Sequence, residues 1–211
     1  MAYYVGLNIF VAPNANSSNN RINDMFLGAQ EYWRQHGIIL DWFWHHFPDA
    51  DPQDYWWAYT NEEYFAKDFD YTDPDTLQDL LPYTQGVNNW IGLFFVGGNR
   101  LKDGVSTGLT QYRPIVQNNE TIDFQANIVV TDEADPLLLA HEIGHALFAR
   151  IEGNNVDSKA PCCPNDPGGH SNVKDDLMLP TVPSIPNPIL TKAEVEKALQ
   201  SPKCFYVPDR I

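Results

Sequence analysis

The sequence predicts an α+β fold with an α/β-type mixed sheet: a mostly parallel, twisted sheet of about five strands with an antiparallel edge strand. Short runs rich in β-branched and aromatic residues predict strands, and longer stretches with apolar residues at helical spacing predict helices. Their order is strand, helix, four strands and a second helix. This order favours helices packed on one face of the sheet.

The first elements are delimited by clear signals. Residues 3–11 are predicted to form a strand, and residues 21–36 a helix, because apolar side chains recur there every three or four positions. Gly37 is expected to end this helix. Residues 38–47 and 90–96 are predicted to form the next two strands.

Residues 49–83 are acidic, aromatic and irregular, and we expect two short helices there. Thr60 and Glu63 have the spacing of a capping box. Asp73 and Pro74 are typical of the start of another turn.

Further strands are predicted at residues 124–131 and, more weakly, at 104–111. The last helix is expected to open at Thr191, where Glu194 completes a capping box, and to end before Pro202.

The chain is organised around the motif His141-Glu142-Ile143-Gly144-His145. Asp135 can cap the N-terminus of a helix here, and Pro136 suits its first position. In such a helix the two histidines lie on one face, four residues apart, where they can bind one metal ion.

Zinc suits this arrangement, because it binds neutral imidazole nitrogens and lowers the pKa of a bound water to about 7. Glu142 is placed to act as general base on that water and later as general acid. A helix with two chance histidines is the alternative, but the apolar far side of the helix and the preceding strand favour zinc.

Composition limits the classes of partner. The 211-residue chain is 43% hydrophobic, enough for a folded core, and its net charge is −15. This charge argues against nucleic acid and anionic membranes as partners.

No apolar run reaches the roughly 20 residues that span a bilayer, and the N-terminus lacks a signal peptide. Of the three cysteines, Cys162 or Cys163 is expected to pair with Cys204.

A catalytic zinc site needs a third protein ligand. The segment from His170 to Pro180 resembles the H-S-x-V-x-x-x-L-M-x-P segment of the matrixins, within the metzincin clan of zinc endopeptidases. The resemblance implies that His170 is the third zinc ligand and that Met178, eight residues later, forms the tight turn beneath the metal. It also implies a single catalytic domain, 1–211, with an upper subdomain, 1–150, and a lower one, 151–211.

The sequence departs from the metzincin pattern between the second and third histidines. Phe148 and Ile151 occupy the positions of the family's glycine and third histidine. We therefore expect the helix to continue to about Glu152, with Gly153 as its cap. Residues 153–169 are then an inserted loop that returns the chain to the metal, at low entropic cost.

Two alternatives remain open. A thermolysin-like site would take a carboxylate as third ligand, with Glu194 and Glu196 as candidates. A non-catalytic binding module would retain a structural zinc with four protein ligands. Calcium is compatible with the many aspartates, but no EF-hand spacing occurs, and His45-His46 with Asp49 is more typical of a half-buried strand end.

The resemblance implies a zinc-dependent endopeptidase whose substrate is a peptide or protein. The substrate would pair with an edge strand at residues 105–110, and residues 181–186 would wall the pocket beyond the cleaved bond. We expect a monomer that is secreted as a mature domain, although the missing signal peptide leaves an intracellular location open.

Overall fold

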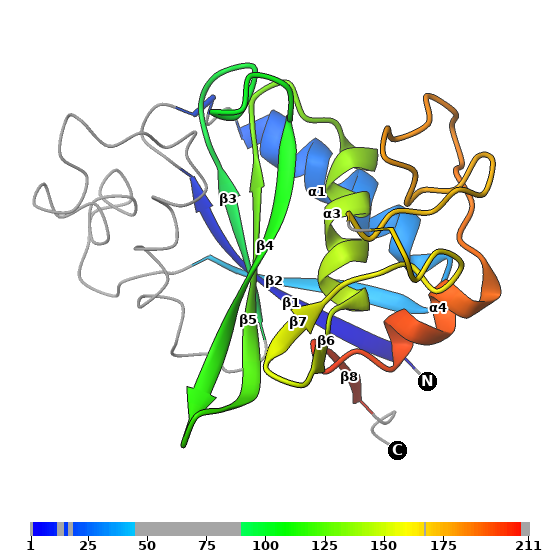
Figure 1. Cartoon of the computed structure of the whole chain (residues 1–211). Coiled ribbons are helices and arrows are strands. Elements are labelled where there is room, and N and C mark those ends of the chain that lie inside the picture. The colour runs from blue at the N-terminus through cyan, green and yellow to red at the C-terminus, as the bar shows by residue number, and fades with distance from the viewer. Residues whose placement is uncertain (1, 12–14, 17–18, 45–89, 167, 208–211) are drawn as a thin grey trace, which may run out of the picture.

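The computed structural model describes residues 2–11, 15–16, 19–44, 90–166 and 168–207 (Figure 1). The expected helices within 49–83, and the group His45, His46 and Asp49, lie outside the described residues. In chain order the elements are β1 (Ala2–Val11), α1 (Asn19–Arg34), β2 (Ile38–Trp44), β3 (Ile91–Phe95), β4 (Gly108–Gln117), β5 (Glu120–Val130), α3 (Pro136–Phe148), β6 (Arg150–Glu152), β7 (Asn155–Asp157), α4 (Lys192–Leu199) and β8 (Cys204–Val207).

The central sheet confirms the predicted fold class. Its strand order is β2-β1-β3-β5-β4; the pairs among the first four strands are parallel, whereas β4 pairs antiparallel with β5. A further strand, β8, pairs antiparallel with the start of β1. Among the described residues, β4 pairs with β5 and with no further strand, so it is an edge strand.

The core lies between the sheet and the helices α1 and α3, which Figure 1 shows on one side of the sheet. All five residues of β3 are buried, as expected for a central parallel strand that is covered on both faces. Trp33 of α1 is fully buried, and its indole N–H donates to the carbonyl oxygen of Ala140 in α3 at 3.1 Å. This bond fixes α1 against the helix that carries the motif.

The β4–β5 hairpin is longer than the two strands predicted from the sequence. Asn118 and Asn119 form its two-residue turn, with φ angles of 53° and 64°. A tight hairpin turn of this kind needs positive φ, and asparagine tolerates it better than most residues. The Asn-Asn pair was therefore the sequence signal for this hairpin.

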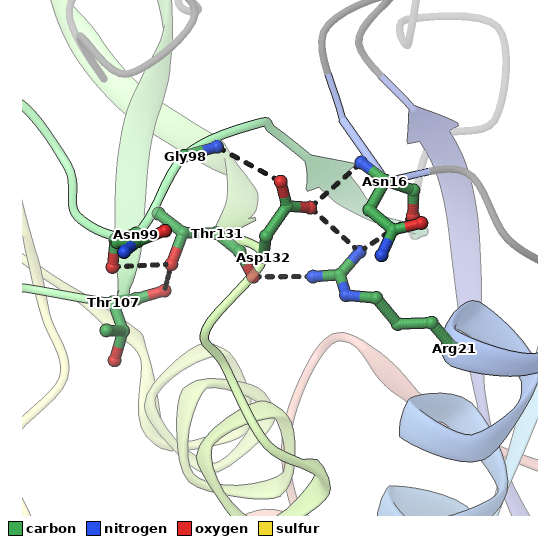
Figure 2. Close-up of polar contacts among 7 residues, drawn as sticks. All are labelled: Asn16, Arg21, Gly98, Asn99, Thr107, Thr131 and Asp132. Atoms are coloured by element: carbon green, nitrogen blue, oxygen red, sulfur yellow. Dashed lines mark hydrogen bonds and ion pairs between the residues drawn. The ribbon is translucent and has the colours of Figure 1, made fainter.

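The turn between β5 and α3 is held by the carboxylate of Asp132 (Figure 2). The backbone N–H groups of Asn16 and Gly98 donate to it at 2.9 and 3.1 Å, and the guanidinium of Arg21 lies 3.3 Å away. Arg21 also donates to the carbonyl oxygen of Thr131 at 2.6 Å. These contacts tie the N-terminus of α1 to the turn that delivers the motif helix.

The expected extension of the motif helix to Glu152 is wrong. Helix α3 ends at Phe148, and a hairpin of β6 and β7 follows, with Gly153 (φ 64°) in its turn. The guanidinium of Arg150 donates to the carbonyl oxygens of Leu147 and Ala149, at 2.8 and 2.6 Å. This side chain satisfies carbonyl groups that a longer helix would have used.

The C-terminal helix follows its prediction. Thr191 and Glu194 form the reciprocal capping box at the start of α4. None of the described helices combines the length and apolar character required to cross a bilayer.

Candidate metal centre

Helix α3 brings two imidazoles together. The side chain of Asp135 accepts a hydrogen bond from the backbone N–H of Leu138 at 2.8 Å, and Pro136 takes the first helical position. His141 and His145 are both buried on one face of this helix, and their Nε2 atoms lie 3.0 Å apart. The cap and the helical period, both read from the sequence, thus place two potential ligands.

The third imidazole arrives from the loop beyond β7. The ring of His170 lies 5.6 Å from that of His141 and 5.1 Å from that of His145, centroid to centroid. The potential ligand atoms of the three side chains all lie within 4.8 Å of one another. The structure therefore brings together the three histidines singled out in the sequence.

The orientation of the His141 ring is fixed by a backbone carbonyl group on the side away from the other two histidines. Its Nδ1 lies 2.7 Å from the carbonyl oxygen of Leu177, which can only accept, so the Nδ1–H donates. This leaves the lone pair of Nε2 directed at the centre of the three rings. Backbone carbonyl groups commonly orient metal-binding imidazoles in this way.

The environment favours the neutral form of the three imidazoles. Burial lowers the pKa of His141 and of His170 below the ordinary histidine value, and it lowers the pKa of His145 well below that value. The neighbouring imidazoles lower the pKa of His145 further. Neutral imidazole is the form that binds a metal ion.

Glu142 lies beside the three rings and touches the edge strand. The hydroxyl group of Thr110 in β4 lies 2.6 Å from Glu142 Oε2 and 2.9 Å from the Glu142 carbonyl oxygen. Burial raises the pKa of Glu142 to about 7, against the hydrogen bond from Thr110, which lowers it. A carboxyl group in this range can take up and release a proton near neutral pH.

Met178 packs against helix α3 at Gly144. The side chain is fully buried, and a Cβ at Gly144 would stand 2.5 Å from its sulfur atom. The absence of a side chain at Gly144 therefore lets the methionine approach the backbone of α3 between the two motif histidines.

The segment from Ser171 to Met178 is closed on itself by a buried carboxylate. Asp176 accepts hydrogen bonds from the Ser171 hydroxyl group at 3.0 Å and from the backbone N–H of Met178 at 2.8 Å. The backbone N–H of Ser171 donates to the carbonyl oxygen of Met178 at 2.7 Å. His170 is thus followed by a hydrogen-bonded turn that leads directly to Met178.

The carboxylate alternative for the third ligand is wrong. Glu194 Oε2 accepts from both the backbone N–H and the hydroxyl group of Thr191 at 2.7 Å, so it serves the helix cap. Glu196 is exposed and lies 3.6 Å from the ammonium group of Lys192. Within the described part of the chain, the potential metal cluster consists of the three histidines alone.

The expected disulfide is not formed. All three cysteines are free, and the sulfur atoms of Cys162 and Cys163 lie 2.8 Å apart. Cys204 belongs instead to β8, where it is paired with Val5 of β1. The loop is closed without a covalent link, by hydrogen bonds such as that from Ala160 N–H to the Gly169 carbonyl oxygen at 3.1 Å.

The expected edge strand at 105–110 is displaced along the chain. Strand β4 begins only at Gly108, whose Cα faces Leu138 and Glu142 of the motif helix. Sequence reasoning also did not identify Thr110 or Asp176. The motif gave no signal for Thr110, whereas the buried Asp176 sits inside the segment on which the resemblance rested.

The three histidines fit a zinc ion. Tetrahedral zinc bonded to nitrogen at about 2.0–2.1 Å separates neighbouring nitrogen atoms by about 3.3 Å. The 3.0 Å between His141 Nε2 and His145 Nε2 is close to this separation, and burial lowers the pKa of both rings, which favours their neutral form. Three nitrogen ligands are the number found in catalytic zinc sites, whereas structural sites are closed by four protein ligands.

The similarity of this chain to known proteins is low. No protein-family model and no curated protein matches the sequence. Among solved structures, the chain is similar to metalloproteinase-II from Bacteroides fragilis, with a TM-score of 0.45 and 14% sequence identity. The match covers 93% of this chain and 52% of that chain, so this chain spans about half the length of that protein.

Proposed function

We propose that the protein is a zinc-dependent endopeptidase of metzincin type. One observation carries the proposal: three imidazoles, from His141, His145 and His170, converge beside the buried carboxyl group of Glu142. A structural zinc site has no use for a titratable carboxyl group next to its ligands, whereas hydrolysis requires one.

The residues divide the chemistry between them. Bound zinc would polarise a peptide carbonyl group and lower the pKa of water to about 7. Glu142 takes a proton from the attacking water and returns it to the leaving amine. Thr110 holds one carboxylate oxygen of Glu142, at 2.6 Å, so the other oxygen is available for the water. Met178 supports the floor below.

The substrate we propose is an extended peptide that pairs with β4. This strand has a free edge among the described residues, and its first residue, Gly108, lies against Glu142. An added strand would therefore run past the carboxyl group with its backbone hydrogen-bonded to β4. Residues 181–186, which follow Met178, would line the pocket beyond the cleaved bond. Secretion and a monomeric state remain part of this proposal.

The test compares Glu142→Gln with the native protein. Both are incubated with a mixed peptide library, with and without a chelator, and cleavage products are identified by mass spectrometry. We expect Glu142→Gln to bind zinc with the native stoichiometry and to lose about 10²–10⁴-fold of the activity, because the general base is missing. Full activity in this variant would contradict the mechanism.

A matched control makes the same chemical change outside the site. Glu133 is exposed in the turn before α3, and Glu133→Gln should leave cleavage unchanged. His170→Ala tests the third ligand separately: zinc content measured after dialysis should fall strongly. Unchanged zinc content would remove His170 from the site.

A further inference from the structure

We propose that Asp166 is a positioning residue that orients the His170 imidazole toward the metal. The inference rests on the proposed zinc site, and it concerns how an irregular loop can hold a ligand as firmly as a helix does.

The carboxylate of Asp166 binds the backbone around His170. Its Oδ1 accepts hydrogen bonds from the backbone N–H groups of Gly168 and His170, at 2.9 and 3.0 Å. The same oxygen lies 3.5 Å from His170 Nδ1. One atom therefore contacts both the backbone and the ring of the third histidine.

This contact selects one nitrogen of the ring. When Nδ1 carries the proton and faces Asp166, the lone pair of Nε2 is left for the metal. A carboxylate behind a metal-binding imidazole fixes its tautomer and raises its basicity.

Two glycines shape the backbone next to the ring. A Cβ at Gly168 would stand 2.5 Å from His170 Nδ1, so the ring lies directly against this glycine. Gly169 has a φ of +73°, and a Cβ there would stand 2.8 Å from the Ser158 carbonyl oxygen. The two glycines allow the bend, and Asp166 sets the direction of the ring within it.

The helical ligands are held differently. His141 is oriented by the carbonyl oxygen of Leu177, and both helical imidazoles are buried within a regular helix. His170 is partly exposed, with 25% of its side chain accessible, and lies on a loop without helical hydrogen bonds. Asp166 would therefore do for the His170 ring what the carbonyl oxygen of Leu177 does for the His141 ring.

The experiment measures zinc affinity, by competition with a chromophoric chelator, for the native protein, Asp166→Asn and Asp166→Ala. Loss of an outer-shell partner typically weakens metal binding about 10–100-fold. We expect about 10-fold for Asp166→Ala, because the carboxylate is partly exposed, and a smaller loss for Asp166→Asn, which keeps an oxygen for the backbone N–H groups. Asn165→Ala, at the exposed neighbouring residue, should change nothing.

A double-mutant cycle separates positioning from general loosening of the loop. In a His170→Ala background, Asp166→Ala should cause no further loss of zinc affinity, because it acts through the absent imidazole. The melting temperature of the metal-free Asp166→Ala protein shows whether the variant is folded. An equal loss of affinity in both backgrounds, or native affinity in folded Asp166→Ala, would overturn the proposal.

Failure of the proposed function gives a different result. If the native protein binds no zinc, the metal site and the role of Asp166 both fall. If the native protein binds zinc through the three histidines and Asp166→Ala binds it equally well, only the role of Asp166 falls.

Discussion

Helix α3 and the loop from β7 to Met178 supply the same kind of ligand by different physical means. The helix places His141 and His145 by its period, and the carbonyl oxygen of Leu177 orients the His141 ring. The loop places His170 by side-chain contacts to the backbone, chiefly those of Asp166 and Asp176. In a helix, the spacing of two ligands in the sequence therefore sets where they lie, whereas a loop needs contacts from further residues to hold its ligand in place.

If the loop is held by its carboxylates, removal of the most buried one should have the largest effect on stability. Asp176→Ala leaves the backbone N–H of Met178 and the hydroxyl group of Ser171 without their acceptor. An unsatisfied buried donor costs about 1–3 kcal/mol. We expect a corresponding loss in the free energy of unfolding, measured by urea denaturation of the metal-free protein.

The control for this variant deletes a carboxylate from the regular part of the molecule. Asp24 is exposed on α1, and Asp24→Ala should change stability by only a few tenths of a kcal/mol. A loss for Asp176→Ala as small as this control would mean that the turn is held by other contacts.

The predictability of the two regions follows from the same contrast. Asp135, Pro136 and the two histidines of α3 are close together in the sequence. The sequence therefore predicts both the helix and the position of the two histidines on one of its faces. The end of the helix was not predicted, because it depends on the contacts of Arg150, including one with the carbonyl oxygen of Lys197, 47 residues away.

The loop was predictable only through resemblance. His170 and Met178 were identified by a family pattern, because no spacing rule relates them to His141. The contacts that position them, from Asp166 and Asp176, depend on backbone geometry that composition does not reveal.

The pH dependence of stability tests the junction between the loop and α4. Burial raises the pKa of Glu194 to about 7, and the neighbouring charge of Asp176 raises it as well, although hydrogen bonds from Thr191 lower it. The folded protein therefore holds a proton that the unfolded chain releases near its ordinary value of 4.5. The resulting stabilisation is complete below that value and is lost as the pH rises through about 7.

Glu194→Gln should remove this dependence. The glutamine oxygen can still accept from Thr191, and the side chain carries no proton that titrates. Melting temperatures of the metal-free variant should vary less between pH 5 and 8 than those of the native protein. The exposed Glu196→Gln should keep the native dependence, and an unchanged profile in Glu194→Gln would contradict the assignment.

The contact between Gly144 and Met178 tests whether the helix and the loop form one unit. Gly144→Ala should destabilise the protein, because its Cβ would stand 2.5 Å from the methionine sulfur. In a Met178→Ala background the same change should cost less, since the space is vacant. We expect a coupling energy of about 0.5–3 kcal/mol from urea denaturation of all four proteins. Additive effects would mean that the two regions are packed independently.

The smallest expected effect concerns the helix cap, and it separates stability from ligand orientation. Asp135→Ala removes the acceptor for the Leu138 N–H and should cost about 1 kcal/mol of unfolding free energy. Zinc affinity should stay native, because ten buried residues hold α3 and its histidines in place. Asp166→Ala should show the reverse, with reduced affinity and little change in stability. If Asp135→Ala weakened zinc binding as much as Asp166→Ala, the helix would depend on its terminal contact as the loop does, and the contrast between the two regions would be lost.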